Sequence, residues 1–317
     1  MKKFDRFKQF GGWRLLKAYA SLGLIRVCIK QVLRIVVFRE KPIDAYRNLQ
    51  HQVVPLLRQR YAKVLDSCEL KYNIPSLVRH RANYVWVCWL QGMENAPELV
   101  KVCFASLKTN LNERNVVLLT ERNIHEYVTL PDFIEEKYRK GIIPAAHYSD
   151  LLRLQLLIEH GGTWIDATVM CTGRNYPKDL IDSDFFVFQH LEKGEYIFRG
   201  MSNWFITSCT NNWVLMVVRD MLYTYWKDYD CVLNYFMFHQ FFFMVMERHP
   251  EVAASMPRYS NAIPHYLSRR IGDEYDEQWM TELKKRTSFH KLNYRVDEKV
   301  KREGTFYDVV IRHTIAY

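Results

Sequence analysis

The chain has 317 residues and a mass of 38.1 kDa; 49% of its residues are hydrophobic and 25% are charged. This length suffices for one large domain or two modest ones, and the composition excludes a disordered, collagen-like or coiled-coil protein. The formal net charge is +10, but residues 1–41 hold eleven basic and two acidic side chains and therefore +9 of that charge. Because the remainder is nearly neutral, we expect no basic groove for a nucleic acid.

The cysteines indicate a reducing compartment. There are seven of them, an odd number, and none forms a C-x-x-C pair. Most stand among apolar neighbours, which favours buried thiols over a disulfide framework or a zinc site. We therefore expect a cytoplasmic protein.

The segment from Leu15 to Phe38 has the pattern of an amphipathic helix. It is rich in Leu, Ile and Val, and Arg26, Lys30 and Arg34 recur every four residues, which places the cations on one helical face. Three cations make a membrane-spanning helix costly, and the segment lacks the cleavage site of a signal peptide. Two interpretations remain open: a helix lying on an anionic membrane surface through residues 1–40, or a helix packed on the protein's own body.

The remaining elements follow in order from residue 45. A second amphipathic helix is expected over about 45–72. A β-α-β pattern follows, which is typical of an α/β sheet with a buried parallel strand, and its predicted elements are a strand at 84–92, a helix at 97–107 and a strand at 115–120. Further strands are expected at 185–190, 203–208 and 307–314. Further helices are expected at 211–226, at 232–248 and, rich in Lys and Arg, after Met280.

Residues 145–171 carry the strongest functional pattern. A helix over about 147–160 ends at Gly161–Gly162, and a strand follows over 163–170. The helix spans ~20 Å in one direction and the strand returns over a similar length. Asp150 and Arg153, in the first helical turns, are therefore expected at the same sheet edge as Asp166 and Thr168. That edge, at the carboxyl ends of the strands, is where open α/β folds bind ligands.

Each of these polar residues has a structural alternative. Asp150 could interact with the helix dipole, and Arg153 could be its surface partner three residues on. Asp166 is different because its neighbours Trp164, Ile165, Val169 and Met170 are apolar. A carboxylate in such a strand needs a partner or a metal, which favours a functional role.

The helix–Gly-Gly–strand segment resembles the donor-sugar motif of glycosyltransferase family 32, in particular its bacterial capsular polysaccharide synthesis branch. The matching residues are Ser149-Asp150-Leu151-Leu152-Arg153, Gly161-Gly162, Trp164 and Asp166. Strand 85–92 with Ala96-Pro97 resembles the element of that family where the nucleotide base docks. The resemblance extends loosely over residues 75–317.

The resemblance implies a GT-A-like (Rossmann-like) α/β fold, a nucleotide-sugar donor and retention of anomeric configuration. It implies that Trp89 and Gln91 flank the base and that Asn203 or Trp204 lies nearer the sugar. Asp150 would hold sugar hydroxyls and Arg153 would bridge sugar and phosphate. Asp166 would serve ribose and metal, and Asp166 and Asp150 are the expected catalytic residues.

The chain departs from that family at Thr168, which stands where a D-x-D motif has its second Asp. A hydroxyl is a poor sole ligand for Mn²⁺ or Mg²⁺, which prefer anionic oxygen. Three outcomes are open: Asp166 takes the metal itself with Thr168, a late residue such as His313 or Asp308 contributes, or the metal is used weakly.

We expect residues 1–74 to form a basic helical extension and residues 75–317 a transferase domain. The expected function is transfer of a sugar from a nucleotide-diphosphate-sugar donor to a growing, lipid-linked capsular or other surface glycan. The expected location is the inner face of the cell membrane. The alternative is a non-catalytic, membrane-associated scaffold on a degenerate transferase fold, which the missing second Asp favours and the intact Asp150, Arg153 and Asp166 oppose.

Overall fold

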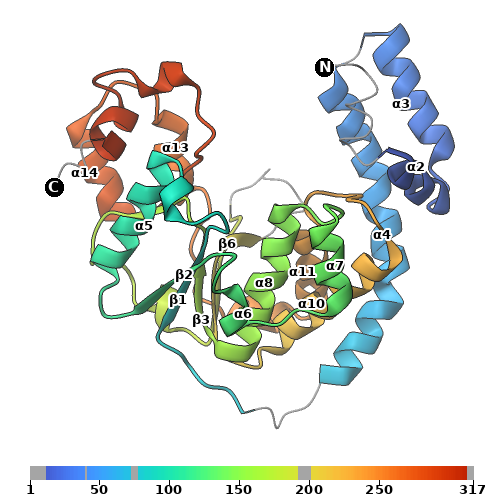
Figure 1. Ribbon diagram of the computed structural model, residues 1–317, viewed down its shortest axis with the longest axis horizontal. Coiled ribbons are helices and arrows are strands. Elements are labelled where there is room, and N and C mark those ends of the chain that lie inside the picture. Colours follow the sequence, from blue (N-terminus) through green and yellow to red (C-terminus); the bar gives the residue numbers. More distant parts are fainter. Residues whose placement is uncertain (1–11, 40, 73–77, 192–200, 313–317) are drawn as a thin grey trace. The chain divides into compact units, whose positions relative to one another are not determined.

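The computed structural model describes residues 12–39, 41–72, 78–191 and 201–312 (Figure 1). These residues form two compact units. Unit 1 takes the described residues of 1–76, 130–154 and 213–250, and unit 2 those of 77–129, 155–212 and 251–317. The predicted division into 1–74 and 75–317 stays a prediction.

Unit 2 is built on a five-stranded mixed sheet. Its strands are β1 Tyr84–Cys88, β2 Asn115–Leu119, β3 Gly162–Ile165, β5 Phe185–Gln189 and β6 Met201–Ser208. Their spatial order is β2-β1-β3-β6-β5, and Figure 1 labels β2, β1, β3 and β6. The pairs β1–β2 and β1–β3 are parallel, whereas β6 runs antiparallel to both β3 and β5. The predicted α/β class with a parallel apolar strand pair is therefore confirmed.

Apolar runs explain why these segments are strands. Val85 and Val87 of β1 point into one core together with Val100 and Leu107 of helix α5 (Glu98–Asn110), and all four are almost fully buried. On another side of β1, the ring of Trp86 packs against Tyr127. The sheet is thus covered by apolar contacts, as a parallel strand pair requires.

The predicted single strand over 163–170 is wrong, because the segment forms two strands in two sheets. β3 ends at Ile165, and β4 (Val169–Cys171) pairs antiparallel with β7 (Phe289–Lys291) in a separate two-stranded sheet. Between them Asp166 forms a turn, in which its carbonyl accepts from the N–H of Val169 at 2.9 Å. Both halves are apolar, so the sequence pattern does not reveal the turn that separates them.

Gly161 and Gly162 end helix α8 (Ala145–His160) as predicted, and both have positive φ, 67° and 93°. A Cβ at Gly162 would stand 2.5 Å from the carbonyl oxygen of Tyr84. The carbonyl of Gly161 accepts from the indole of Trp86 at 2.9 Å. The glycine pair therefore allows the chain to turn from the helix directly into a strand that lies close to β1.

Unit 1 is helical. Its long helix is α4 (Pro42–Tyr72), which confirms the helix predicted over 45–72, and it packs on α10 (Trp213–Asp228) and α11 (Met237–Arg248). The buried Tyr61 of α4 lies with its ring 5.0 Å from that of Phe241. Its hydroxyl donates to Asp228 at 2.7 Å. A further helix of this unit is α7 (Asp132–Arg139).

The helix predicted over 15–38 is interrupted. Helices α2 (Gly12–Ser21) and α3 (Ile25–Val37) are separated by a turn in which Gly23 has φ 73°. The left-handed conformation at Gly23 breaks the helix, although the apolar pattern continues across it. Figure 1 shows α3 beside α4, on which it packs.

The predicted final strand over 307–314 is also wrong in its described part, 307–312, and residues 313–314 lie outside the described residues. Residues Asp308–Arg312 form a π-helical turn, η4, which packs against α5 and contains the buried Ile311. The run Val309-Val310-Ile311 is apolar enough for either structure, and the strands that the structure describes do not pair with it. The other short elements are α6 Ile124–Tyr127, α9 Asp179–Asp182, α12 Pro250–Ser255, α13 Tyr266–Arg270, α14 Glu277–Arg286, η1 Met93–Asn95, η2 Ile263–His265 and η3 Glu298–Lys301.

Within the described ranges, every helix is too short or too polar to cross a lipid bilayer.

Candidate functional site at the carboxyl end of β3

Asp166 directly follows β3, and hydrogen bonds hold both its side chain and its backbone. Its Oδ1 accepts from the indole Nε1 of Trp164 at 2.9 Å, and its Oδ2 accepts from Nζ of Lys291 at 2.8 Å. Its backbone N–H donates to the carbonyl of Trp204 at 2.9 Å. The side chain remains 26% exposed, so the carboxylate is fixed in place and still open to solvent on one side.

Lys291 joins the two residues that the sequence singles out on this segment. Its Nζ also donates to Oγ1 of Thr168 at 2.7 Å, and its side chain is 19% exposed. The pairing of β4 with β7 explains this position, because Val169 stands opposite Lys291 in the register. The N–H of Leu292 donates to the carbonyl of Thr168 at 2.9 Å and continues the pairing.

The described residues do not fit a Mn²⁺ or Mg²⁺ site. Around Asp166 and Thr168 they provide one carboxylate, one hydroxyl and an ammonium group, and the ammonium group bonds to both oxygens that a metal would need. No cluster of three or more His, Cys, Asp or Glu side chains with metal-binding geometry occurs in the described ranges. Asp308 is buried and accepts from the N–H of Gly304 at 3.1 Å, and His313 lies outside the described residues.

Two histidines near Lys291 are neutral at neutral pH. Burial lowers the pKa of His290 to about 3, and its Nε2 lies 3.0 Å from Oγ1 of Thr172. Burial is also the main cause that lowers the pKa of His265, with Lys291 a smaller one. Lys291 is therefore the cation that faces Asp166.

Trp89 lies at the same edge as Asp166. It follows β1, and the parallel register of β1 and β3 sets Trp86 opposite Trp164, which places Trp89 level with Ala167. Trp89 packs against the core cluster that contains Ala167, and its ring contacts the edge of Tyr294 at 5.3 Å. Its indole Nε1 is buried and has no acceptor among the described residues, so it can donate to a ligand. Gln91 is exposed in the turn that follows.

The two candidates on β6 have different environments. Trp204 is buried, stacks on Phe188 at 4.7 Å and donates from Nε1 to Asn261 at 2.8 Å, so its ring belongs to the core. Asn203 precedes it at the same sheet edge and is partly exposed. Asn203 is the better placed of the two for a sugar, and that role stays a prediction.

Asp150 and Arg153 lie in the first turns of α8, in unit 1. Arg153 Nη2 stands 3.5 Å from Asp150 Oδ1, and Nε and Nη2 donate to the carbonyl and hydroxyl oxygens of Ser149 at 3.2 and 2.9 Å. Both charged residues are buried, so the alternative of a surface pair is wrong. Because Asp166 and Thr168 belong to unit 2, the convergence of the four residues stays a prediction.

Arg153→Lys is expected to lower turnover of a nucleotide-sugar at least about tenfold. A lysine keeps the charge but cannot donate in a fixed fork to Ser149 and at the same time face Asp150. The measurement is release of nucleoside diphosphate, with Arg139→Lys on α7 as the control for an exposed arginine. Equal turnover in both variants would contradict a functional role of Arg153.

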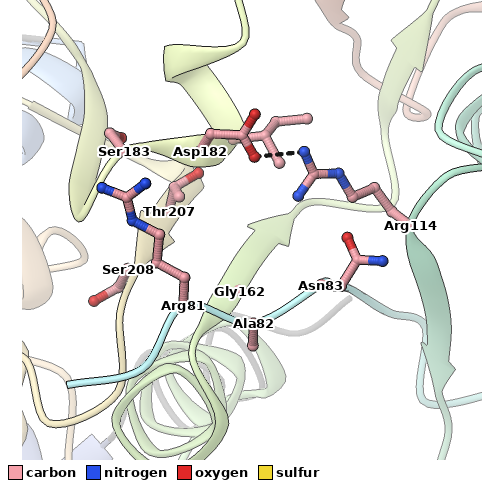
Figure 2. Close-up of a pocket in the computed structure, with 10 residues that line it drawn as sticks. Arg81, Ala82, Asn83, Arg114, Gly162, Asp182, Ser183, Thr207 and Ser208 are labelled. Carbon is pink, nitrogen blue, oxygen red and sulfur yellow. Dashed lines mark hydrogen bonds and ion pairs between the residues drawn. The ribbon is translucent and has the colours of Figure 1, made fainter. Parts of the chain in front are cut away.

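The structure also contains a cavity of about 230 Å³ in unit 2, shown in Figure 2. It is lined by Arg81, Ala82, Asn83, Arg114, Gly162, Ile181, Asp182, Ser183, Thr207 and Ser208. Gly162 begins β3, so the cavity lies at the sheet edge opposite Asp166. Arg114 is ion-paired with Asp182 inside it. The cavity thus does not contain the predicted site residues.

Sequence reasoning missed Lys291 and Tyr294. Both follow a predicted basic helix, and Lys291 is one of many lysines in that region. The short strand Phe289–Lys291 that positions it offers no pattern beyond one aromatic residue, so neither residue could be recognised before the pairing of β4 with β7 was known.

The fold and the site together describe a mixed α/β protein with a polar cluster at the carboxyl end of its central strands. A model of the family described as "Capsular polysaccharide synthesis protein" matches residues 35–310, which is most of the chain. The chain therefore belongs to the capsular polysaccharide synthesis protein family.

Two further comparisons add little. A solved structure titled "PaToxG Glycosyltransferase" is similar at 14% sequence identity with a TM-score of 0.37, covering 65% of this chain and 80% of that one. No curated protein matches the sequence. The likeness to glycosyltransferase family 32 in particular stays a resemblance.

Proposed function

We propose that this chain is a glycosyltransferase that moves a sugar from a nucleotide-diphosphate-sugar to a growing capsular or other surface glycan. Membership of the capsular polysaccharide synthesis family supports this class of activity, since building a polysaccharide requires glycosyl transfer. The observation that carries the proposal is the solvent-open carboxylate of Asp166 fixed at the carboxyl end of β3. That is the edge at which α/β folds bind nucleotides.

The chemistry of transfer explains the residue types. As the bond between the sugar and the diphosphate breaks, the anomeric carbon gains positive charge and the diphosphate gains negative charge. A fixed carboxylate near the sugar and a fixed cation near the phosphate lower the barrier, because they need no reorganisation. The buried N–H of Trp89, which has no acceptor among the described residues, is a candidate hydrogen-bond donor for a base or ribose at the same edge.

The test is a panel of nucleotide-sugars incubated with the full chain, scoring release of nucleoside diphosphate with and without a glycan acceptor. Consumption of one donor supports the proposal, and the anomer of the product, read by NMR, decides retention. No consumption of any donor, combined with saturable binding of one of them, favours the non-catalytic scaffold.

We further propose that α3 binds the surface of an anionic membrane, at the inner face of the cell membrane. One stripe of α3, with Cys28 and Gln31, is buried against the protein's own body, as is Leu24, which directly precedes the helix. A second stripe is apolar and exposed, with Ile29 56% and Val32 58% accessible, and its other members are Ile25 and Leu33. The buried stripe supports packing of this helix on the protein's own body, and the exposed apolar stripe supports binding to a membrane surface.

The charges beside the exposed apolar stripe indicate that it binds an anionic lipid surface. Arg26 and Lys30 are exposed and flank the apolar side chains at helical spacing. An apolar stripe next to cations is the pattern of a helix that lies in a lipid headgroup layer and attracts anionic lipids.

Ile29→Glu is expected to reduce binding to phosphatidylglycerol vesicles at least about tenfold, because it places a carboxylate in the apolar stripe. Co-sedimentation of the full chain measures it. Leu70→Glu on α4 is the matched control, since Leu70 is 80% exposed outside the stripe, and it should bind like the parent. Equal loss in both variants, or equal retention, would refute α3 as the membrane-binding helix.

A further inference from the structure

We propose that Lys291 is the cation that faces the diphosphate of the donor, in the place where related sites would hold a divalent metal, so that transfer needs no metal ion. This inference rests on the proposed function. It follows from the disagreement between the expected metal site and the residues that occupy it, Asp166, Thr168 and Lys291.

Charge balance supports the replacement. A D-x-D pair with a divalent metal sums to zero charge. Here threonine replaces the second carboxylate, and one ammonium group replaces the metal, so the cluster of Asp166, Thr168 and Lys291 again sums to zero. Thr168 carries one negative charge fewer than an Asp would, and Lys291 carries one positive charge fewer than a divalent metal would, so the two changes cancel.

Geometry supports it as well. An ammonium group has three N–H donors. Two of them bond to Asp166 Oδ2 at 2.8 Å and Thr168 Oγ1 at 2.7 Å, the two partners that the described part of the chain provides. The third is left for a ligand oxygen. At 19% exposure the charge is shielded from most water, which strengthens its attraction for a phosphate.

Among the described residues, Lys291 is the cation that bonds directly to Asp166. His290 precedes it on β7 and is fully buried, and His265 on η2 packs against the same strand. Arg270 on α13 is committed to Asp273 at 2.9 Å. Asp166 is the acidic group that Lys291 touches.

The transfer step balances without a bond being made or broken at Lys291. The bond between the anomeric carbon and the diphosphate oxygen breaks, and its electron pair stays on that oxygen. The acceptor hydroxyl oxygen forms the new bond to the anomeric carbon, and its proton passes to water. Lys291 offsets the negative charge gained by the diphosphate, as a metal does in other transferases.

Inorganic pyrophosphate is the first probe, titrated into the full-length protein by calorimetry in EDTA and again with Mn²⁺. We expect binding in EDTA with an affinity that Mn²⁺ changes less than twofold. In parallel, pyrophosphate in EDTA should slow acetylation of Lys291 by acetic anhydride, read by mass spectrometry, while Lys285 reacts unchanged. Binding that requires Mn²⁺, or an unprotected Lys291, overturns the proposal.

Variants give an independent test. Lys291→Gln should weaken pyrophosphate binding at least about tenfold, because it removes a charged hydrogen bond, whereas Lys291→Arg should retain most of it and Lys285→Gln all of it. Thr168→Asp combined with Lys291→Met should create tight Mn²⁺ binding, detected by electron paramagnetic resonance, that the parent lacks. Tight Mn²⁺ binding by the parent overturns the proposal even if Lys291→Gln does not fold.

The outcomes separate this inference from the proposed function. Pyrophosphate protection of Lys291 without consumption of any nucleotide-sugar supports the anion site and refutes transfer. Consumption of a nucleotide-sugar that stops in EDTA supports transfer and refutes the role of Lys291.

Discussion

Asp166→Asn is expected to reduce release of nucleoside diphosphate at least about 100-fold, the cost of removing one fixed electrostatic group from an active site. Asparagine is nearly isosteric, but it carries no charge. It therefore cannot stabilise the positive charge that develops on the sugar, and it cannot neutralise the ammonium group of Lys291. Because asparagine keeps the shape of the side chain and one acceptor oxygen, and the site is open to solvent on one side, the melting temperature should stay within a few degrees. The assay is steady-state turnover at saturating donor, with a thermal melt of each protein.

Asp182→Asn is the matched control for that variant. Asp182 is also ion-paired in unit 2, with Arg114, but it lies in the cavity at the opposite sheet edge. Its loss should leave turnover within about twofold of the parent, as is usual for a surface charge away from the chemistry. Turnover that is unchanged in Asp166→Asn, or equally reduced in both variants, would place the site elsewhere in the chain.

Gly162→Ala is expected to destabilise the protein by more than about 4 kcal/mol or to prevent folding, the range reached when backbone strain and overpacking combine. The φ of 93° is unfavourable for alanine, and the new Cβ would stand 2.5 Å from the carbonyl oxygen of Tyr84, a backbone atom that cannot move without disturbing β1. Denaturant unfolding followed by circular dichroism measures the change.

Substitutions at two control glycines separate the effect of backbone strain from the effect of the steric clash with Tyr84. Gly304 has a φ of 76° and open space around its Cβ position, so Gly304→Ala should cost only the backbone term of about 1–2 kcal/mol. Gly173 also has open space and lacks a positive φ, so Gly173→Ala should be close to neutral. A Gly162→Ala variant as stable as Gly304→Ala would show that the close approach of β3 to β1 is not needed.

The sequence predicted most of the fold because its elements carry strong periodic patterns. Strands Tyr84–Cys88 and Asn115–Leu119 and helix Ala145–His160 were recognisable from apolar runs and the glycine stop. The errors fall where one apolar pattern suits two structures. Residues 163–170 contain a turn, where the hydrogen bond from Asp166 to Trp204 and the pairing of β4 with β7 decide the outcome. Residues 308–312 form a helical turn, which begins with local hydrogen bonds to Thr305.

The site was predicted less completely. Asp166 was recognisable because a carboxylate among apolar residues needs a reason, and the structure supplies partners for it in Trp164 and Lys291. Lys291 was not recognisable, because its importance depends on its contact with Asp166 and not on its neighbours in the sequence. For Arg153 the sequence allows a surface or a functional role, and burial removes the surface alternative.

The distance along the chain between Asp166 and Lys291 determines when the two residues can pair during synthesis. The two partners are 125 residues apart, and at ~5–20 residues per second a ribosome adds Lys291 roughly ten seconds after Asp166. During that interval β4 has no strand to pair with, and its backbone donors and acceptors form an open edge. Docking of β7 closes this edge and brings the cation to the carboxylate in the same event, so the newborn protein acquires its charge-balanced cluster only after residue 291 has been made.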